Sequence, residues 1–209
     1  MFCWNNVDSS RLRRADTFSR RTLDIGQKYH TNEHSRGKLP KSTFLPLLCL
    51  MKQWIVRRGT PADVPGVMQL VRELAEYERA PNEVSNTEEA MLRDGFGAEP
   101  AFGLFVAELN NEVVGIALHY VRYSTWKGKM LYLEDIVVKE NLRGQGIGAE
   151  LFEACLHYCL EKNYAGMTWQ VLDWNEPALN FYRKYSATLD GEWINGKLLA
   201  SEIRKMNLS

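Results

Sequence analysis

The sequence predicts an α/β fold with a mixed central sheet, and three observations lead to that prediction. Beyond residue 50, apolar periodicity gives the order β-α-α-β-β-β-α-β-α-β, in which meandering strands precede strand–helix–strand crossovers. The 209 residues are 45% hydrophobic and 25% charged, as in ordinary globular domains. The net charge is +0, and no apolar stretch reaches the roughly 20 residues that span a bilayer. We therefore expect neither a nucleic-acid nor a membrane partner.

The first 50 residues differ in character from the rest. They carry nine Lys and Arg against four Asp and Glu, a net charge of +5, whereas residues 51–209 carry 17 against 22, a net charge of −5. They also lack periodic apolar patterning. The acids Asp8, Asp16, Asp24 and Glu33 argue against a transit peptide. We expect residues 1–50 to be a disordered extension, or to precede a true start at Met51, and residues 51–209 to form the functional domain.

The first part of that domain is predicted to contain a strand and two helices. A short strand covers residues 54–56. Thr60 is the expected N-cap of a helix that runs to about Glu78, with Pro61 in the first helical position, where its missing N–H costs nothing. Apolar residues recur along this helix at spacings of three and four. Thr87 is expected to cap a second, shorter helix that ends near Gly95.

Three strands come next, followed by two strand–helix units. Asn110 and Asn111 form the turn between the first two strands. The predicted strands are 104–109, 113–123, 130–138, 167–172 and 197–206, and the predicted helices are 149–162 and 177–185. Cys155 and Cys159 lie one turn apart on the apolar face of the longer helix, where we expect small core residues and not a metal or redox pair.

Three glycines at alternate positions, Gly144, Gly146 and Gly148, lie between a predicted strand and a predicted helix. Glycine lets the backbone approach a ligand closely, and the first N–H groups of a helix have no partner within it. Such groups bind anions, and Arg143 can add positive charge. The segment therefore predicts a pyrophosphate cradle. It is not a Walker A loop, because no Gly-Lys-Ser/Thr follows.

A dinucleotide-binding unit is the main competing interpretation of this loop. With Ala149 counted, the segment satisfies G-x-G-x-x-G/A, and Asp173 ends the next predicted strand about where a ribose-binding acid would lie. Against this, five residues separate the strand from Gly144, whereas the dinucleotide fingerprint turns tightly off its strand. Only 36 residues follow Asp173, too few to complete a doubly wound sheet.

Residues 136–148 resemble the acetyl-CoA site of the GNAT superfamily of N-acetyltransferases, whose pattern is Arg/Gln-x-x-Gly-x-Gly/Ala. Gln145 and Gly148 fit that pattern, and Arg143-Gly144 offers an overlapping match. Further segments resemble the diamine (spermidine/spermine) and thialysine N-acetyltransferases of this superfamily: residues 73–78, 94–97, 126–129, 132–135, 174–177 and 180–182. The resemblance covers residues 54–206 and none of the first 50.

The resemblance implies a GNAT-like sheet that is mostly antiparallel and flanked by helices, with acetyl-CoA in a cleft where two central strands splay apart. It implies that the backbone of Ile136 and Val138 pairs with the pantetheine arm, and that the protein is a homodimer. We expect a cytoplasmic location. The expected acetyl-CoA contacts are Ile136, Val137, Val138, Arg143, Gly144, Gln145, Gly146, Ile147, Gly148, Ala149, Asn175, Pro177, Ala178 and Tyr182.

The chemistry can be argued from the groups that the reaction needs. An aliphatic amine, with a pKa of about 10.4, is protonated at neutral pH and cannot attack a thioester until a base takes its proton. The departing thiolate needs a proton or a hydrogen bond, which a phenol can supply. Glu134 and Asp135 are adjacent in a strand, so only one should face a given pocket unless a bulge intervenes. The resemblance implies that Glu134 is the base, acting through water, and that Tyr182 donates to the thiolate.

The net charge of −5 on residues 51–209 suits a small cationic amine. The resemblance gives Tyr77, Glu78, Asp135 and Glu192 as amine-binding candidates, to which we add the implied base Glu134. Trp126 is a further candidate, because an indole ring can cover an alkyl chain or contact an ammonium group by a cation–π interaction. Polyamines, short diamines and thialysine-like amines all stay open as substrates. So do two other functions, acetylation of a protein lysine or N-terminus and a non-catalytic CoA- or dinucleotide-binding module. No histidine or cysteine cluster has metal-ligand spacing, so we expect no metal.

Overall fold

The computed structural model describes residues 53–192 and 194–206, and the expectations for residues 1–50 lie outside this range. The strands are β1 (Trp54–Arg58), β2 (Gly103–Leu109), β3 (Glu112–Ser124), β4 (Gly128–Val138) and β5 (Met167–Trp169). The α-helices are α1 (Val64–Tyr77), α2 (Glu88–Phe96), α3 (Ile147–Glu161), α4 (Glu176–Arg183) and α5 (Ala200–Ile203). Within this part of the chain, no helix is both long enough and apolar enough to cross a membrane.

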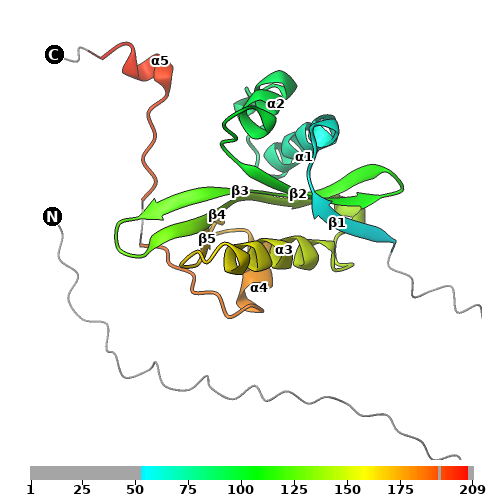
Figure 1. Ribbon diagram of the computed structural model, residues 1–209. Coiled ribbons are helices and arrows are strands. Elements are labelled where there is room, and N and C mark those ends of the chain that lie inside the picture. The colour runs from blue at the N-terminus through cyan, green and yellow to red at the C-terminus, as the bar shows by residue number, and fades with distance from the viewer. Residues whose placement is uncertain (1–52, 193, 207–209) are drawn as a thin grey trace, which may run out of the picture. The chain divides into compact units, whose positions relative to one another are not determined.

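The five strands form one sheet in chain order, β1-β2-β3-β4-β5. The first three pairings are antiparallel, and only β4 and β5 run parallel. Helices α1 and α2 lie on one face of the sheet, and α3 and α4 lie on the other (Figure 1). The predicted fold class, a mostly antiparallel mixed sheet flanked by helices, is confirmed.

Local chemistry explains where α1 begins. Residues 61–63 form a short 3-10 turn, and Thr60 donates to the Asp63 carboxylate from its backbone N–H at 2.7 Å and from its hydroxyl at 2.9 Å. Arg57 of β1 donates to both oxygens of that carboxylate, at 2.8 and 2.7 Å. The guanidinium hydrogen bonds lower the pKa of Asp63 to about 2. The buried carboxylate therefore joins the start of the helix to the first strand.

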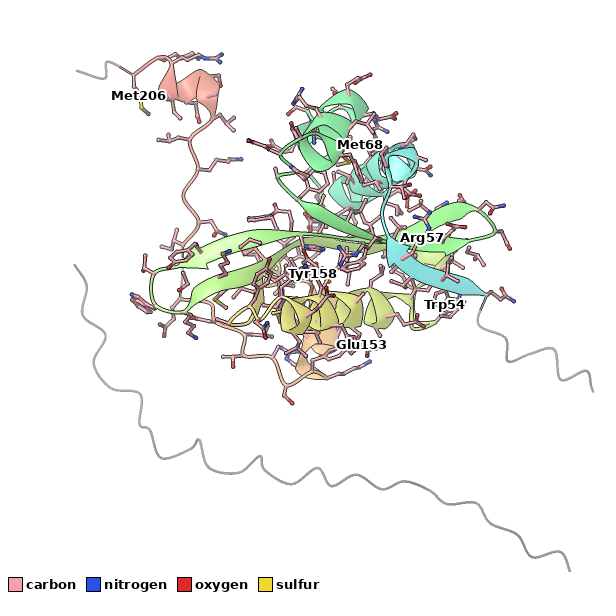
Figure 2. All side chains as sticks on the ribbon, in the orientation of Figure 1. Trp54, Arg57, Met68, Glu153, Tyr158 and Met206 are labelled. Carbon is pink, nitrogen blue, oxygen red and sulfur yellow. The ribbon has the colours of Figure 1, made fainter. Side chains whose placement is uncertain are left out.

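Each face of the sheet carries its own hydrophobic core. On the α1 side, Met68 packs with strand residues such as Ile116 and Val137. On the α3 side, Phe152 and Cys155 pack with strand residues such as Leu133. Met68 and Tyr158 mark these two sides in Figure 2. Cys155 and Cys159 are buried free thiols, as expected from their position on the apolar face.

The sequence-based boundaries are wrong in two places near the C-terminal end. Strand β5 ends at Trp169 and not at residue 172, because it pairs with β4 over only three residues. The strand expected over residues 197–206 is instead the short helix α5. A strand needs a neighbour for its backbone groups, whereas this helix satisfies its own. Its first turn is capped by Glu202, which accepts the Leu199 N–H at 2.6 Å.

Candidate active site

The alternation of side chains along strand β4 is shifted by one residue partway along the strand. Leu131 and Leu133 pack in the α3-side core, whereas Val137 packs in the α1-side core. Residues two or four apart in a regular strand share a face, so an extra residue must intervene. The β3–β4 register jumps between Asp135 and Leu133, which leaves Glu134 as the extra residue of a bulge. The exception allowed by the sequence analysis is therefore present, and both carboxylates line the same cleft.

Strands β4 and β5 diverge immediately beyond this bulge. They pair over residues 131–133 of β4 and separate after Trp169. A cavity of about 560 Å³ occupies the divergence, lined by residues of α1, β4, α4, the loop before α3 and the segment after β5. The Val138 carbonyl points into this gap and accepts a hydrogen bond from Arg143 Nε at 3.0 Å. Between β4 and β5 the cleft thus exposes backbone groups that no described strand pairs.

One end of the cleft is formed by the glycine loop. Gly144 and Gly146 have φ values of +77° and +100°, which side chains other than glycine rarely adopt. Gly146 is the N-cap of α3, and the first helical hydrogen bond runs from the Glu150 N–H to the Gly146 carbonyl at 3.1 Å. The N–H groups of residues 147–149 therefore have no acceptor within the helix. Together with the helix dipole they form a site suited to phosphate.

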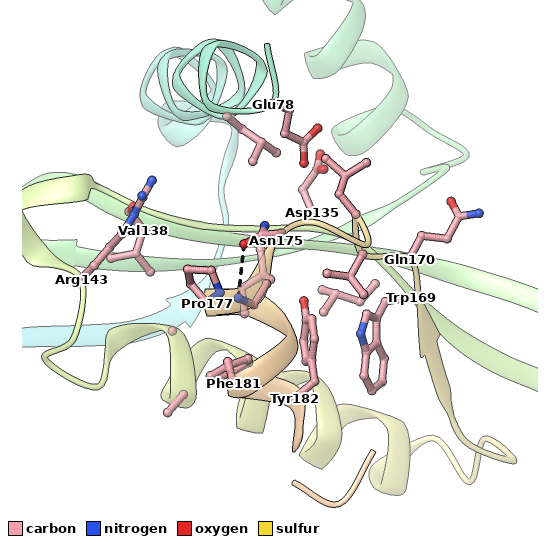
Figure 3. A pocket seen from close by; sticks show the side chains of 18 of the residues that line it. Glu78, Asp135, Val138, Arg143, Trp169, Gln170, Asn175, Pro177, Phe181 and Tyr182 are labelled. Atoms are coloured by element: carbon pink, nitrogen blue, oxygen red, sulfur yellow. Dashed lines mark hydrogen bonds between the residues drawn. The ribbon is translucent and has the colours of Figure 1, made fainter. Parts of the chain in front are cut away.

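Helix α4 places a buried phenol in the cleft. Asn175 caps this helix, and its side-chain oxygen accepts the Ala178 N–H at 3.3 Å and the Tyr77 hydroxyl at 3.1 Å. Tyr182 is 4% exposed, and its ring packs on Trp169 with centroids 4.8 Å apart. Burial raises the pKa of Tyr182 to about 12, so the phenol stays protonated at neutral pH. Its hydroxyl points into the cleft toward β4 (Figure 3).

The wall opposite Tyr182 is acidic. The carboxyl groups of Glu78, at the end of α1, and Asp135, on β4, point toward one another in Figure 3. Burial raises the pKa of Asp135 to about 6, with further contributions from Glu134 and Glu78. Burial also raises the pKa of Glu78. Glu134 is more exposed and lies beside Tyr120, whose pKa is raised chiefly by burial and then by the Glu134 carboxylate.

Most of the site residues expected from the sequence line this cleft. These are Glu78, Glu134, Asp135, Ile136, Val138, Arg143, Gly144, Gly146, Gly148, Ala149, Asn175, Pro177, Ala178 and Tyr182. Among the described residues, no three His, Cys, Asp or Glu side chains are grouped as metal ligands would be.

Six expected residues do not line the cleft. The side chains of Val137 and Ile147 are buried in the two cores, because strand alternation and helix periodicity turn them inward. Tyr77 lies at the rim, bonded to Asn175. The others are Gln145, an exposed loop residue, Trp126, in the β3–β4 turn, and Glu192, exposed in the segment beyond α4.

Sequence reasoning missed a largely apolar part of the lining, together with the polar Gln170 and the cationic Lys184. The missed residues are Leu74, Leu133, Leu142, Trp169, Gln170, Val171, Leu172, Phe181 and Lys184. Residues 169–172 follow the carboxyl end of a parallel strand, a common position for ligand contacts in α/β sheets. The sequence could have predicted ligand contacts at this position. It could not have predicted that β5 separates from β4 after only three pairs.

A cleft lined by the unpartnered N–H groups at the start of α3 and by the backbone of β4 beyond its pairing with β5 fits a phosphate-bearing acyl carrier. The buried phenol of Tyr182 and the acidic wall line the same cleft. This arrangement defines the class of the protein as an acyl-CoA-dependent transferase.

Comparison with known proteins gives the family. The model of the acetyltransferase (GNAT) family matches residues 67–186, more than half of the chain. The protein belongs to this family and is an N-acetyltransferase. Members of the family use acetyl-CoA.

Individual relatives agree with this assignment. Thialysine N-epsilon-acetyltransferase of Bos taurus is 40% identical over 141 residues, which cover 64% of this chain and 83% of that protein. Spermidine/spermine N(1)-acetyltransferase-like protein 1 of Homo sapiens is 33% identical over 144 residues, covering 66% of this chain and 21% of that protein. An aminoglycoside acetyltransferase from an uncultured soil metagenomic sample, crystallised with trehalose, matches with a TM-score of 0.60 and 25% identity, covering 70% and 96% of the two chains.

Proposed function

We propose that this enzyme acetylates a primary amine of a small cationic substrate, of the thialysine, diamine or polyamine class, by direct transfer from acetyl-CoA in a ternary complex. One observation carries the proposal: Glu78, Glu134 and Asp135 line the same cleft, and Tyr182 points into it across from the carboxyl groups of Glu78 and Asp135 (Figure 3). Acids on one side attract an ammonium group, and a neutral phenol on the other can stabilise a departing thiolate. The names of the relatives support the same class of substrate.

The residues present fit acetyl-CoA. The free N–H groups at the start of α3 suit its pyrophosphate, and Arg143 and Lys184 line the cleft with positive charge. The backbone of Ile136 and Val138 at the open edge of β4 suits the amides of a pantetheine arm. Bound there, acetyl-CoA would supply the activated acetyl thioester. The protein would supply position, charge and proton transfer.

Asp135 is the residue that we propose accepts the proton of the amine, directly or through water. A general base works best when its pKa lies near the working pH, and the pKa of Asp135 is about 6. At neutral pH the carboxylate is mostly ionised and can both attract the ammonium group and take its proton. Glu134, the base implied by resemblance, is the more exposed of the two. In this proposal Glu134 and Glu78 hold the ammonium group beside Asp135.

Tyr182 acts in this proposal as a hydrogen-bond donor to the developing thiolate. A thiol has an ordinary pKa of about 8.5, well below the value of about 12 that burial gives to Tyr182. The proton therefore stays on the phenol while its hydrogen bond stabilises the negative charge on sulfur. Aromatic packing on Trp169 and Phe152 holds the ring in place.

The test is to measure CoA release by the full-length protein with thialysine, putrescine, spermidine, free lysine and a lysine-containing peptide. We expect one free amine to exceed the peptide in kcat/KM by about tenfold or more, a difference of about 1.4 kcal/mol in transition-state binding. A peptide acetylated faster than every free amine would identify a protein acetyltransferase. Acetyl-CoA binding without transfer to any of the five would contradict the proposed activity.

We also propose that the enzyme is a homodimer. The segment after α4 carries apolar side chains that are exposed in the single chain: Leu189, Ile194, Leu198, Leu199, Ile203 and Met206. Exposed apolar side chains gathered in one segment are typical of interaction surfaces. Sedimentation equilibrium should give twice the monomer mass of 24.1 kDa, and the monomer mass at micromolar concentration would contradict the proposal.

A further inference from the structure

A second cavity, of about 440 Å³, lies at the end of the sheet where strand β2 begins. The last β2–β3 pair is Gly103 with His119, and beyond it β3 continues to Ser124 paired with β4. The end of α2 and the loop after it border the cavity, together with Arg58 of β1 and Tyr158 of α3. It shares no lining residue with the acetyl-CoA cleft. Tyr158 marks its α3 side in Figure 2.

His119 lines this cavity with its hydrogen-bonding capacity unused. The residue is 4% exposed, and its ring packs against Phe105 and Tyr158 with centroids 5.3 and 4.9 Å apart. Neither ring nitrogen makes a hydrogen bond to another described residue. Burial, followed by the charge of Arg58, lowers the pKa of His119 to about 4, so the ring is neutral at pH 7 and carries one donor and one acceptor. Among the described residues, Thr168 Oγ1 is the one fully buried side-chain nitrogen or oxygen without a partner, so the ring nitrogens of His119 are accessible from the cavity.

Arg58 gives the cavity a positive charge. Its guanidinium lies 4.9 Å from the centroid of Tyr158 and 5.8 Å from that of Phe105, which holds it over the cavity wall. The neighbouring Arg57 is engaged by two carboxylates, whereas Arg58 has no ion pair within the described part of the chain. No Asp or Glu is among the residues that line the cavity. Arg58 is therefore the one charged side chain in the described lining, and the carboxylate of Glu134 lies behind that lining, beside Tyr120.

The remaining lining is largely aromatic and apolar. Phe96 and Phe102 come from the α2 side and Tyr120 comes from β3. Small and apolar residues complete the wall: Gly59, Gly95, Pro100, Ala101, Gly103, Leu104 and Val121. Pockets of about 300–1,000 Å³ with apolar walls and a few polar groups are typical small-molecule sites. We propose that this cavity binds a small aromatic carboxylate, whose anionic group pairs with Arg58 and an imidazole N–H of His119 while its ring lies among the aromatic side chains. This second site is independent of the proposed amine substrate.

The experiment is a titration of the full-length, isotope-labelled protein with phenylacetate in the presence of saturating CoA, followed by NMR. We expect saturable shifts of the amides of Gly95, Gly103 and Val121, which line the cavity, and none at Gly146 or Ala178, which line the CoA cleft. Neutral phenylacetamide and inorganic phosphate, which each lack one half of the ligand, should bind at least about tenfold more weakly, as expected from loss of a charge-assisted contact or of apolar burial.

Two variants test the residues that carry the proposal. Arg58→Gln should weaken phenylacetate binding about tenfold or more, while the matched change Arg72→Gln, at another exposed arginine on α1, should leave it unchanged. His119→Phe keeps an aromatic ring against Phe105 and Tyr158 and should also weaken binding. Wild-type affinity in Arg58→Gln, equal binding of phenylacetamide, shifts confined to the CoA cleft, or no saturable shift would each overturn the proposal.

Discussion

Asp135→Asn should make the protein more stable at alkaline pH and less active. Burial raises the pKa of Asp135 from 3.8 to about 6, so the folded state ionises this carboxyl less readily than the unfolded state does. Well above pH 6 the ionised carboxylate therefore lowers the free energy of unfolding. Each unit of pKa difference corresponds to about 1.4 kcal/mol, so the difference between 3.8 and about 6 amounts to about 3 kcal/mol. This cost falls to about half at pH 5 and disappears below the unfolded-state pKa, where both states are protonated. Asparagine is neutral throughout and removes it.

The assay is urea unfolding of the wild type and Asp135→Asn at pH 8 and pH 5. We expect the variant to be more stable by about 3 kcal/mol at pH 8 and by about half of that at pH 5. Its kcat should fall by about a hundredfold or more, as expected for loss of a general base. Glu134→Gln is the matched control, and because Glu134 is exposed its stability should change by less than about 0.5 kcal/mol.

Two results would refute this reasoning. Equal stability of wild type and Asp135→Asn at both pH values would show that the ionised carboxylate costs the fold nothing. A kcat that is retained in Asp135→Asn but lost in Glu134→Gln would transfer the role of base to Glu134.

Three further predictions concern the phenol, the glycine loop and the start of α1. Tyr182→Phe should lower kcat about tenfold or more in the CoA-release assay while the ring packing preserves the thermal midpoint, and unchanged turnover would remove the hydroxyl from the mechanism. Gly146→Ala forces alanine to φ +100°, a strain of about 1–2 kcal/mol, and should raise the KM for acetyl-CoA, whereas Gly191→Ala should not. Arg57→Gln removes the guanidinium that pairs with the buried Asp63 carboxylate. The free energy of unfolding, measured in urea at pH 7, should fall by about 3 kcal/mol. Because the pKa of Asp63 is lowered to about 2, that loss should shrink as the pH falls from 4 toward 2, and a pH-independent loss would contradict the ion-pair explanation.

Local features were the ones that the sequence predicted correctly. The Thr87 cap of α2 is present, since its hydroxyl accepts the Ala90 N–H at 3.2 Å. The turn at Asn110 and Asn111 has φ values of +52° and +63°, as a tight hairpin requires. The glycine loop before α3 forms where its spacing indicated. Caps, turns and glycine conformations depend on a few consecutive residues, so the amino-acid sequence alone contains the information.

The features that make a site out of these elements were decided by the tertiary structure. The bulge at Glu134 depends on how β4 registers against β3, and the opening of the cleft depends on how far β5 follows β4. Glu78, at the end of a helix, lies beside Asp135, in a strand more than 50 residues later in the chain. Each of these follows from pairing and packing between distant segments, which a periodic pattern cannot specify. The sequence by itself therefore determined the fold class and the glycine loop at the start of α3, whereas the tertiary structure decided which carboxylates face the phenol.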